Sequence, residues 1–166
     1  MSYTTILAVY PGEKVEELFE LGNAWGSAPV IWEAMAQKYL NKGAFGAGDE
    51  LWGLWKDQKI PLLHRTVHLI TFDRAFISKK DFKQAAQDIR AFLKDFPQPE
   101  NHINHWFSIA DYLEANPNVP AIGFHMTSVS ENPFHGDWNE EDETYDPPKW
   151  SKCYSVYDEI NGSVEA

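Results

Sequence analysis

The clearest pattern in this sequence runs from His64 to Phe96, HRTVHLITFDRAFISKKDFKQAAQDIRAFLKDF, and we expect the rest of the chain to be arranged around it. In its first part, Thr66 to Phe72, apolar residues occupy both alternating sets of positions, which is typical of a strand buried on both faces. We therefore expect a central strand here, followed by a short corner and one helix.

The second part of this stretch predicts an amphipathic helix. Ser78 can cap its N-terminus, and Ile77 before the cap can pack on Phe82 as a hydrophobic staple. Pro97 should end the element, because proline cannot continue a helix. Apolar residues recur between these limits at spacings of three and four, at Phe82, Ala85, Ala86, Ile89, Leu93 and Phe96.

Toward the N-terminus we expect one strand and then helices. Thr4 to Tyr10 is apolar and β-branched and is stopped by Pro11-Gly12, which predicts a strand. Glu13 to Gly22 places apolar residues on one helical face and glutamates on the other, so we expect a short helix there. Ser27, with Pro29 two positions on, predicts the start of a longer helix.

This longer helix should end near Asn41, and the segment from Gly43 to Gly48, GAFGAG, should be a mobile loop. It matches no phosphate-binding glycine pattern and is followed by two acids, so we do not expect it to hold phosphate. Asp49 then predicts the cap of a short helical turn.

Beyond Pro99, one more helix and two more strands are expected. Asn101 can cap a helix that contains Trp106 and ends before Asn116-Pro117. Val119 to Val129 reads as a strand. Cys153 to Ile160 could return as a last strand.

The order of these elements predicts an α+β fold, with a single mixed β-sheet of about four strands and helices packed against it. A chain of 166 residues fits one domain over 1–166, because folding at this size buries roughly 70% of the surface of the unfolded chain. The segment 130–150 is expected to be a long acidic loop, since it contains several prolines and the run NEEDETYD.

Composition favours a cytoplasmic protein without a membrane segment. The single cysteine, Cys153, excludes an internal disulfide and is consistent with a reducing compartment. The N-terminus has no basic region of the kind found in signal peptides, and no uninterrupted apolar run approaches the roughly 18 residues of a membrane span. The sequence leaves the oligomeric state open.

The net charge of −11 is unevenly distributed. Residues 49–96 hold nine Lys and Arg against seven Asp and Glu, a charge of +2, whereas the rest of the chain holds five against eighteen, a charge of −13. Such an acidic chain is not expected to bind nucleic acid through ordinary phosphate contacts, which need a basic face. It could instead attract a protein partner with a basic surface.

The acidic loop is the candidate surface for such a partner, because acids and aromatics are interleaved along it. The main functional hypothesis is therefore a non-enzymatic protein-interaction module, an inhibitor or immunity type of binder, although a solvated loop with no partner would have a similar composition. The candidate partner-binding residues are Phe134, Asp137, Trp138, Glu140, Glu141, Asp142, Glu143 and Tyr145.

A small metal-dependent or histidine-dependent hydrolase is the alternative. His102 and His105 are three apart on an expected helix, and His125 on the next strand could join them. Whether the chain is an enzyme stays undecided, with a non-enzymatic role favoured; no cofactor and no dedicated metal site are expected. His64 and His68, placed on a strand, would lie about 13 Å apart, too far to share an ion.

Three weaker hypotheses complete the set. Cys153 and His125 could form a nucleophile pair if their strands are neighbours, although an inert cysteine is the simpler interpretation. Asp137 begins an EF-hand-like spacing that fails at the sixth and twelfth positions, where Gly and Glu are required. A small-ligand pocket could be walled by tryptophans, namely Trp25, Trp52 and Trp55.

Overall fold

The computed structural model describes residues 2–165, with side chains described for residues 2–162. Its main sheet has five strands in the order β2-β1-β4-β3-β7. Neighbours pair antiparallel except β3 and β7, which are parallel, so the predicted α+β class with a mixed sheet is confirmed. The strands are β1 (Tyr3–Tyr10), β2 (Lys14–Gly22), β3 (Ala75–Ser78), β4 (Ala121–His125) and β7 (Tyr154–Ser155).

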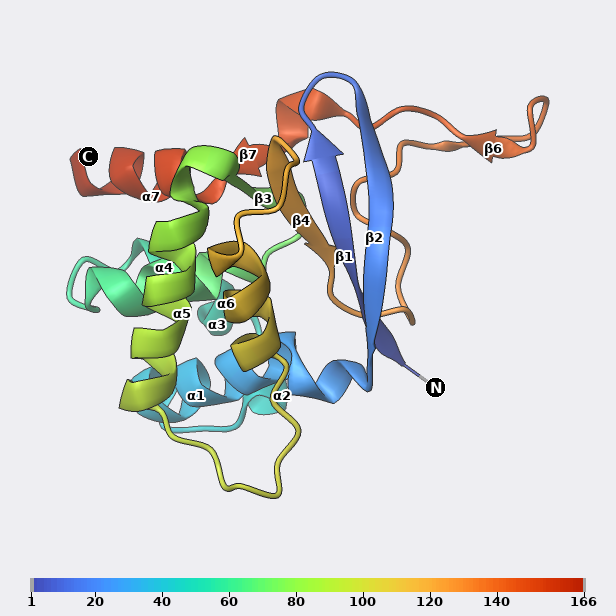
Figure 1. Cartoon of the computed structure of the whole chain (residues 1–166). Helices are drawn as coiled ribbons and strands as arrows, with labels where there is room; N and C mark the ends of the chain where they lie inside the picture. The colour runs from blue at the N-terminus through green and yellow to red at the C-terminus, as the bar shows by residue number, and fades with distance from the viewer. Residues whose placement is uncertain (1, 166) are drawn as a thin grey trace.

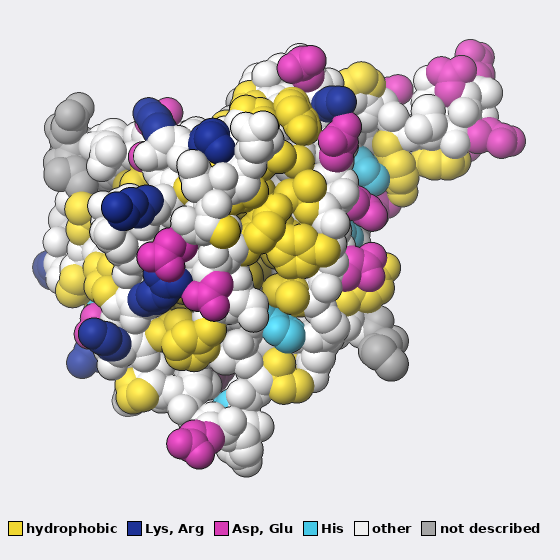
Figure 2. Space-filling model, in the orientation of Figure 1, with side chains coloured by type: hydrophobic (Ala, Val, Ile, Leu, Met, Phe, Trp, Pro, Cys, Tyr) yellow, Lys and Arg dark blue, Asp and Glu magenta, His cyan; other side chains and the backbone are white. Residues whose placement is uncertain are grey.

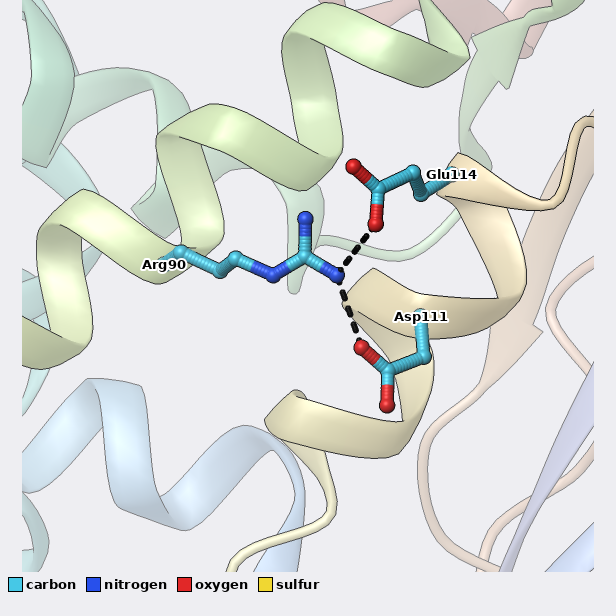
Figure 3. A network of polar contacts seen from close by, with 3 residues as sticks. All are labelled: Arg90, Asp111 and Glu114. Atoms are coloured by element: carbon cyan, nitrogen blue, oxygen red, sulfur yellow. Dashed lines mark hydrogen bonds and ion pairs between the residues drawn. The ribbon is translucent and has the colours of Figure 1, made fainter.

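The helices gather against one face of this sheet (Figure 1). Two of them, α5 and α6, lie side by side and are joined by an ionic network in which one guanidinium nitrogen of Arg90 donates to both Asp111 and Glu114, at 2.7 and 2.8 Å (Figure 3). The helices are α1 (Ala28–Leu40), α2 (Ala44–Ala47), α3 (Asp49–Gly53), α4 (Leu62–Ile70), α5 (Phe82–Asp95), α6 (Trp106–Glu114) and α7 (Val156–Glu165). Short 3-10 turns are η1 (Ala24–Gly26), η2 (Leu54–Lys56), η3 (Lys79–Asp81) and η4 (Trp150–Lys152).

Successive side chains of a strand point to opposite sides, and in the middle of the sheet both faces are covered, whereas the edge strand β2 is largely exposed. In β1, Ile6 belongs to the large core beneath the helices, whereas Leu7 and Val9 belong to a second core on the other face. That second core is closed by Phe134, which is 1% exposed and comes from the long segment before β7.

The central strand expected over Thr66–Phe72 is wrong, because this part of the chain forms most of helix α4. Every residue from His64 to Ile70 is buried, including the polar His64, Arg65, Thr66 and His68. Its apolar residues Val67, Leu69 and Ile70, followed by Phe72, fit a strand as well as a helix, and so short an apolar run cannot be assigned from its periodicity alone. The strand of this region is β3, which begins a few residues later at Ala75.

The amphipathic helix predicted after Ser78 is confirmed as α5, which buries Phe82, Ile89 and Leu93 on one side. It starts later than its predicted cap, because the turn η3 intervenes and Asp81 occupies the N-cap position.

At the N-terminus, the strand expected over Thr4–Tyr10 is confirmed as β1, but the short helix expected over Glu13–Gly22 is wrong. This segment is β2, which forms a hairpin with β1. The pairing shifts between Ile6 opposite Phe19 and Leu7 opposite Glu17, so Leu18 lies in a bulge.

The helix expected after Ser27 is confirmed as α1, and Asn41 ends it in the left-handed conformation with φ of 55°. The expected loop over Gly43–Gly48 instead contains α2. Asp49 is the first residue of α3 rather than its cap, which is Gly48.

The C-terminal elements are shorter than predicted. The helix expected after Asn101 begins only at Trp106, and the strand expected over Val119–Val129 is restricted to β4. The last strand is limited to β7, after which the chain continues as α7. Among the described residues, no helix combines the length and apolar character needed to cross a membrane.

Candidate functional site

The long segment between β4 and β7 carries a hairpin that projects away from the body of the molecule (Figure 1). Its strands are β5 (Trp138–Asn139) and β6 (Thr144–Tyr145), with Trp138 opposite Tyr145. We call residues 136–147 the acidic arm. The predicted acidic loop is thus an ordered β-ribbon over part of its length.

The root of the acidic arm is held by backbone hydrogen bonds. The N–H of Gly136 donates to the carbonyl of Asp146 at 3.0 Å, and the N–H of Asp146 donates to the carbonyl of Asp137 at 2.7 Å. A Cβ at Gly136 would lie 2.4 Å from the carbonyl oxygen of Pro147, so this close approach of two backbones requires glycine.

The tip of the acidic arm is a tight turn organised by Asn139. Its side-chain oxygen accepts hydrogen bonds from the N–H groups of Glu141 and Asp142, at 2.9 and 3.2 Å. Glu143 completes the turn with a left-handed backbone, φ of 50°. The turn presents four acids in succession, Glu140, Glu141, Asp142 and Glu143, and none of them forms an ion pair within the described part of the chain.

Aromatic rings line the acidic arm between its tip and its root. The rings of Trp138 and Tyr145 meet edge to face at 5.0 Å, and Tyr145 also stacks on His135 at 4.4 Å. Trp138 stays 53% exposed and Tyr145 39% exposed. Figure 2 shows acidic side chains gathered at the far end of the arm and hydrophobic side chains closer to the body.

Phe134 differs from the other predicted partner-binding residues because it is buried beneath the sheet rather than offered to a partner. Its ring lies against β4, where a Cβ at Gly123 would come within 2.8 Å of it. We therefore assign Phe134 to anchoring the segment that carries the acidic arm. Asp137, in contrast, is exposed and forms an ion pair with Lys149 at 3.5 Å.

A second feature is a cavity of about 660 Å³ on the helical side of the molecule, which we call the aromatic pocket. Trp25 and Trp52, two of the three predicted pocket tryptophans, line it, whereas Trp55 is not among its lining residues. The sequence interpretation missed Trp32 and Phe45. The available signal for Phe45 was an aromatic residue inside a glycine-rich segment that has no apolar periodicity to explain it.

The three histidines of the hydrolase hypothesis have separate partners. Nε2 of His105 binds the carbonyl oxygens of Gly22 and Asn23, and Nε2 of His125 binds the carbonyl of Ser130. His102 lines the aromatic pocket. Among the described residues, no three His, Cys, Asp or Glu side chains are placed to hold a metal ion.

His64 and His68 lie one turn apart on α4, not on a strand as expected, and each has its own contacts. His64 lies between the hydroxyl of Tyr39, at 2.5 Å, and the carboxylate of Asp95, at 2.7 Å. Nε2 of His68 bonds to the carbonyl of Leu51 at 2.8 Å. Both imidazoles therefore tie α4 to neighbouring elements.

The proposed Cys153 and His125 pair does not form a hydrogen bond, because the thiol points to the carbonyl of Lys149 and the imidazole to that of Ser130. Burial raises the pKa of the Cys153 thiol above its usual value, which disfavours the thiolate needed for attack.

A smaller, polar cavity of about 260 Å³ lies at the root of the acidic arm. Asp73 and Arg74 are among the residues that line it.

Comparisons with protein-family models, curated proteins and solved structures found no match for this chain. The functional proposals below therefore depend on the geometry and chemistry of the described residues.

Proposed function

We propose that this protein is a binding module of the inhibitor or immunity type, which docks its acidic arm on a basic and partly apolar surface of a partner protein. The observation that carries this proposal is the projection of a hairpin that combines tip acids, which form no ion pair among the described residues, with an exposed Trp138 and Tyr145 pair (Figure 1). A projecting ribbon can enter a concave surface that a flat face cannot reach.

The two kinds of side chain on the acidic arm would have different tasks. Tryptophan and tyrosine are enriched among the residues that supply most of the binding free energy at interfaces, so Trp138 is the expected anchor. The tip acids would act mainly by attracting a basic surface over distance, which raises the association rate more than the final affinity. Ordering of the turn by Asn139 would reduce the entropy cost of binding.

The test uses charge reversal at the tip. Affinity capture with the wild-type protein identifies a partner, and binding of the purified partner is then compared between wild type and the variant with Glu140, Glu141, Asp142 and Glu143 changed to Lys. We expect at least a tenfold slower association at low salt, with a difference that shrinks as salt is raised, because salt screens exposed charges. Trp138→Ala should instead raise the dissociation rate.

A matched control variant distinguishes an effect of the acidic arm from an effect of the net charge alone. Glu13, Glu16, Glu17 and Glu20 are also exposed and lie on or next to β2, so their reversal to Lys changes the net charge by the same amount. If both quadruple variants bind the partner equally well, or lose binding to the same degree, the acidic arm is not the docking surface.

A further inference from the structure

The aromatic pocket lies where several short elements meet. Its walls come from η1, the first half of α1, the segment α2 to α3, and the loop before α6. A volume of about 660 Å³ is within the range of cavities that enclose small organic ligands, roughly 300 to 1,000 Å³.

Exposed apolar side chains converge on this cavity. Twelve large hydrophobic residues are exposed in the described part of the chain, and four of them line the pocket, namely Trp25, Phe45, Trp52 and Ile103. Apolar surface gathered at one concave place indicates a binding site more strongly than the same residues scattered singly.

Part of the pocket wall is fixed before any ligand enters. The indole N–H of Trp32 donates to the hydroxyl of Thr71 at 2.8 Å. The ring of Trp52 meets that of Trp32 edge to face at 5.1 Å and stacks on the buried His68. Trp25 and Phe45, whose rings contact each other at 5.5 Å, are 60% and 84% exposed and form the outer lip.

Glu33 is the only acidic side chain among the described residues that line the pocket, and neither Lys nor Arg lines it. Its carboxylate accepts hydrogen bonds from the side chain of Gln37 and from the N–H of Ala44. These bonds lower the pKa of Glu33 below its usual value, so the group is ionised at neutral pH. The lining of the pocket therefore combines one negative charge, on a side chain that is exposed to solvent, with several aromatic rings.

From this arrangement we infer that the aromatic pocket binds a small organic cation with a flat apolar body, which stacks among Trp25, Trp32 and Trp52 and places its positive charge toward Glu33. Aromatic faces attract cations, tryptophan most strongly, and a nearby carboxylate adds to that attraction. The site is independent of the acidic arm, so either proposal can fail without the other.

The probe is berberine, a flat quaternary cation that becomes fluorescent in apolar surroundings, and the comparison ligand is 1-anilinonaphthalene-8-sulfonate, an aromatic anion. We expect saturable, one-to-one binding of berberine with quenching of Trp fluorescence, and at least tenfold weaker binding of the anion. Glu33→Gln keeps an acceptor for the N–H of Ala44 but removes the charge, so it should weaken berberine binding roughly fivefold to tenfold.

Three variants make the result decisive. Trp52→Ala should weaken berberine binding, whereas Trp138→Ala removes an exposed tryptophan elsewhere and should not. Glu17→Gln removes one exposed charge from β2 and should match wild type, which excludes an effect of net charge alone. The inference is overturned if berberine does not bind, if the anion binds equally well, or if charge reversal of the arm tip abolishes berberine binding while Glu33→Gln has no effect.

Discussion

His68 lies in the middle of the helical layer with one ring nitrogen bonded and the other without a partner. Nε2 can donate its hydrogen to the carbonyl of Leu51, while Nδ1 is buried and unbonded among the described side chains. A neutral ring tolerates this, because its Nδ1 is then an acceptor. A protonated ring would carry a second N–H, and its charge, into a place with no acceptor.

Acid should therefore destabilise the protein through His68. Burial lowers its pKa from 6.5 to about 4. Between these values the unfolded chain binds a proton that the folded chain does not, so the free energy of unfolding falls as the pH drops from about 6.5 toward 4. The loss from this group is on the order of 3 kcal/mol. Urea unfolding at pH 7, 6, 5 and 4 measures it.

The variant His68→Leu should show a shallower dependence of stability on pH in this window, whatever its stability at pH 7, because it has no ring to protonate. His102→Leu removes an exposed imidazole and serves as the matched control. An equal slope in wild type and His68→Leu would contradict the assignment.

At the scale of single elements, the segment that carries the acidic arm depends on one buried ring. Phe134 closes the second core against Leu7, Val9 and Phe76. Gly123 leaves space for it on β4. The arm can thus project freely while its root stays fixed to the sheet.

Truncation of the Phe134 ring should lower the free energy of unfolding. Phe134→Ala leaves a cavity in the second core, and such changes typically lower the free energy of unfolding by about 3 to 5 kcal/mol. Phe45→Ala is the matched control, because its ring is 84% exposed and its loss should cost less than about 0.5 kcal/mol. Chemical denaturation compares them, and Phe134→Leu gives a milder step if the alanine variant does not fold. Similar, small effects of both alanine variants would show that Phe134 is not an anchor.

The elements that the sequence predicted correctly are those with a clear polar side or a clear stop. α5 has both, and β1 ends at a Pro-Gly pair. α4 could not be identified because it is short and its apolar residues Val67, Leu69 and Ile70, followed by Phe72, also fit a strand buried on both faces. β2 is rich in glutamate, a good helix former, and only its pairing with β1 decides its conformation.

The two candidate sites also differ in how far the sequence could predict them. The acidic arm could be located from composition, since acids and aromatics are local in the sequence. The aromatic pocket could be located only in part, because it combines residues from Asn23 to Ile103 that meet only in the folded chain. Trp55, similar in sequence context to Trp52, lies outside it, and nothing local distinguishes the two.

At the scale of the whole molecule, the negative charge of −11 should oppose compaction. We expect the free energy of unfolding to rise by roughly 0.5 to 1 kcal/mol between 20 and 300 mM NaCl, because salt screens repulsion among exposed acids. Denaturation midpoints at the two salt concentrations measure this.

The contribution of repulsion between acids to this salt dependence should differ between regions of the molecule. Changing Glu13, Glu17 and Glu20 to Gln, on or beside β2, should reduce the salt dependence, because these exposed acids lie on the main sheet; Glu16 is kept, since it forms an ion pair with Lys14 at 2.8 Å. The same change at the tip of the acidic arm, which projects into solvent, should leave it nearly unchanged. If the change at the arm tip reduced the salt dependence more than the change on β2, this prediction would be contradicted.

The place of β1 in the sheet also has a consequence for how the protein is made. β1 meets β2 across a short turn, but Thr5 lies opposite His125, 120 positions later. The hairpin can form early, whereas the pairing with β4 must wait until most of the chain has left the ribosome. We expect nascent chains to expose one edge of β1 throughout that interval, so that a chaperone that recognises extended apolar segments would find its target at Thr4 to Tyr10.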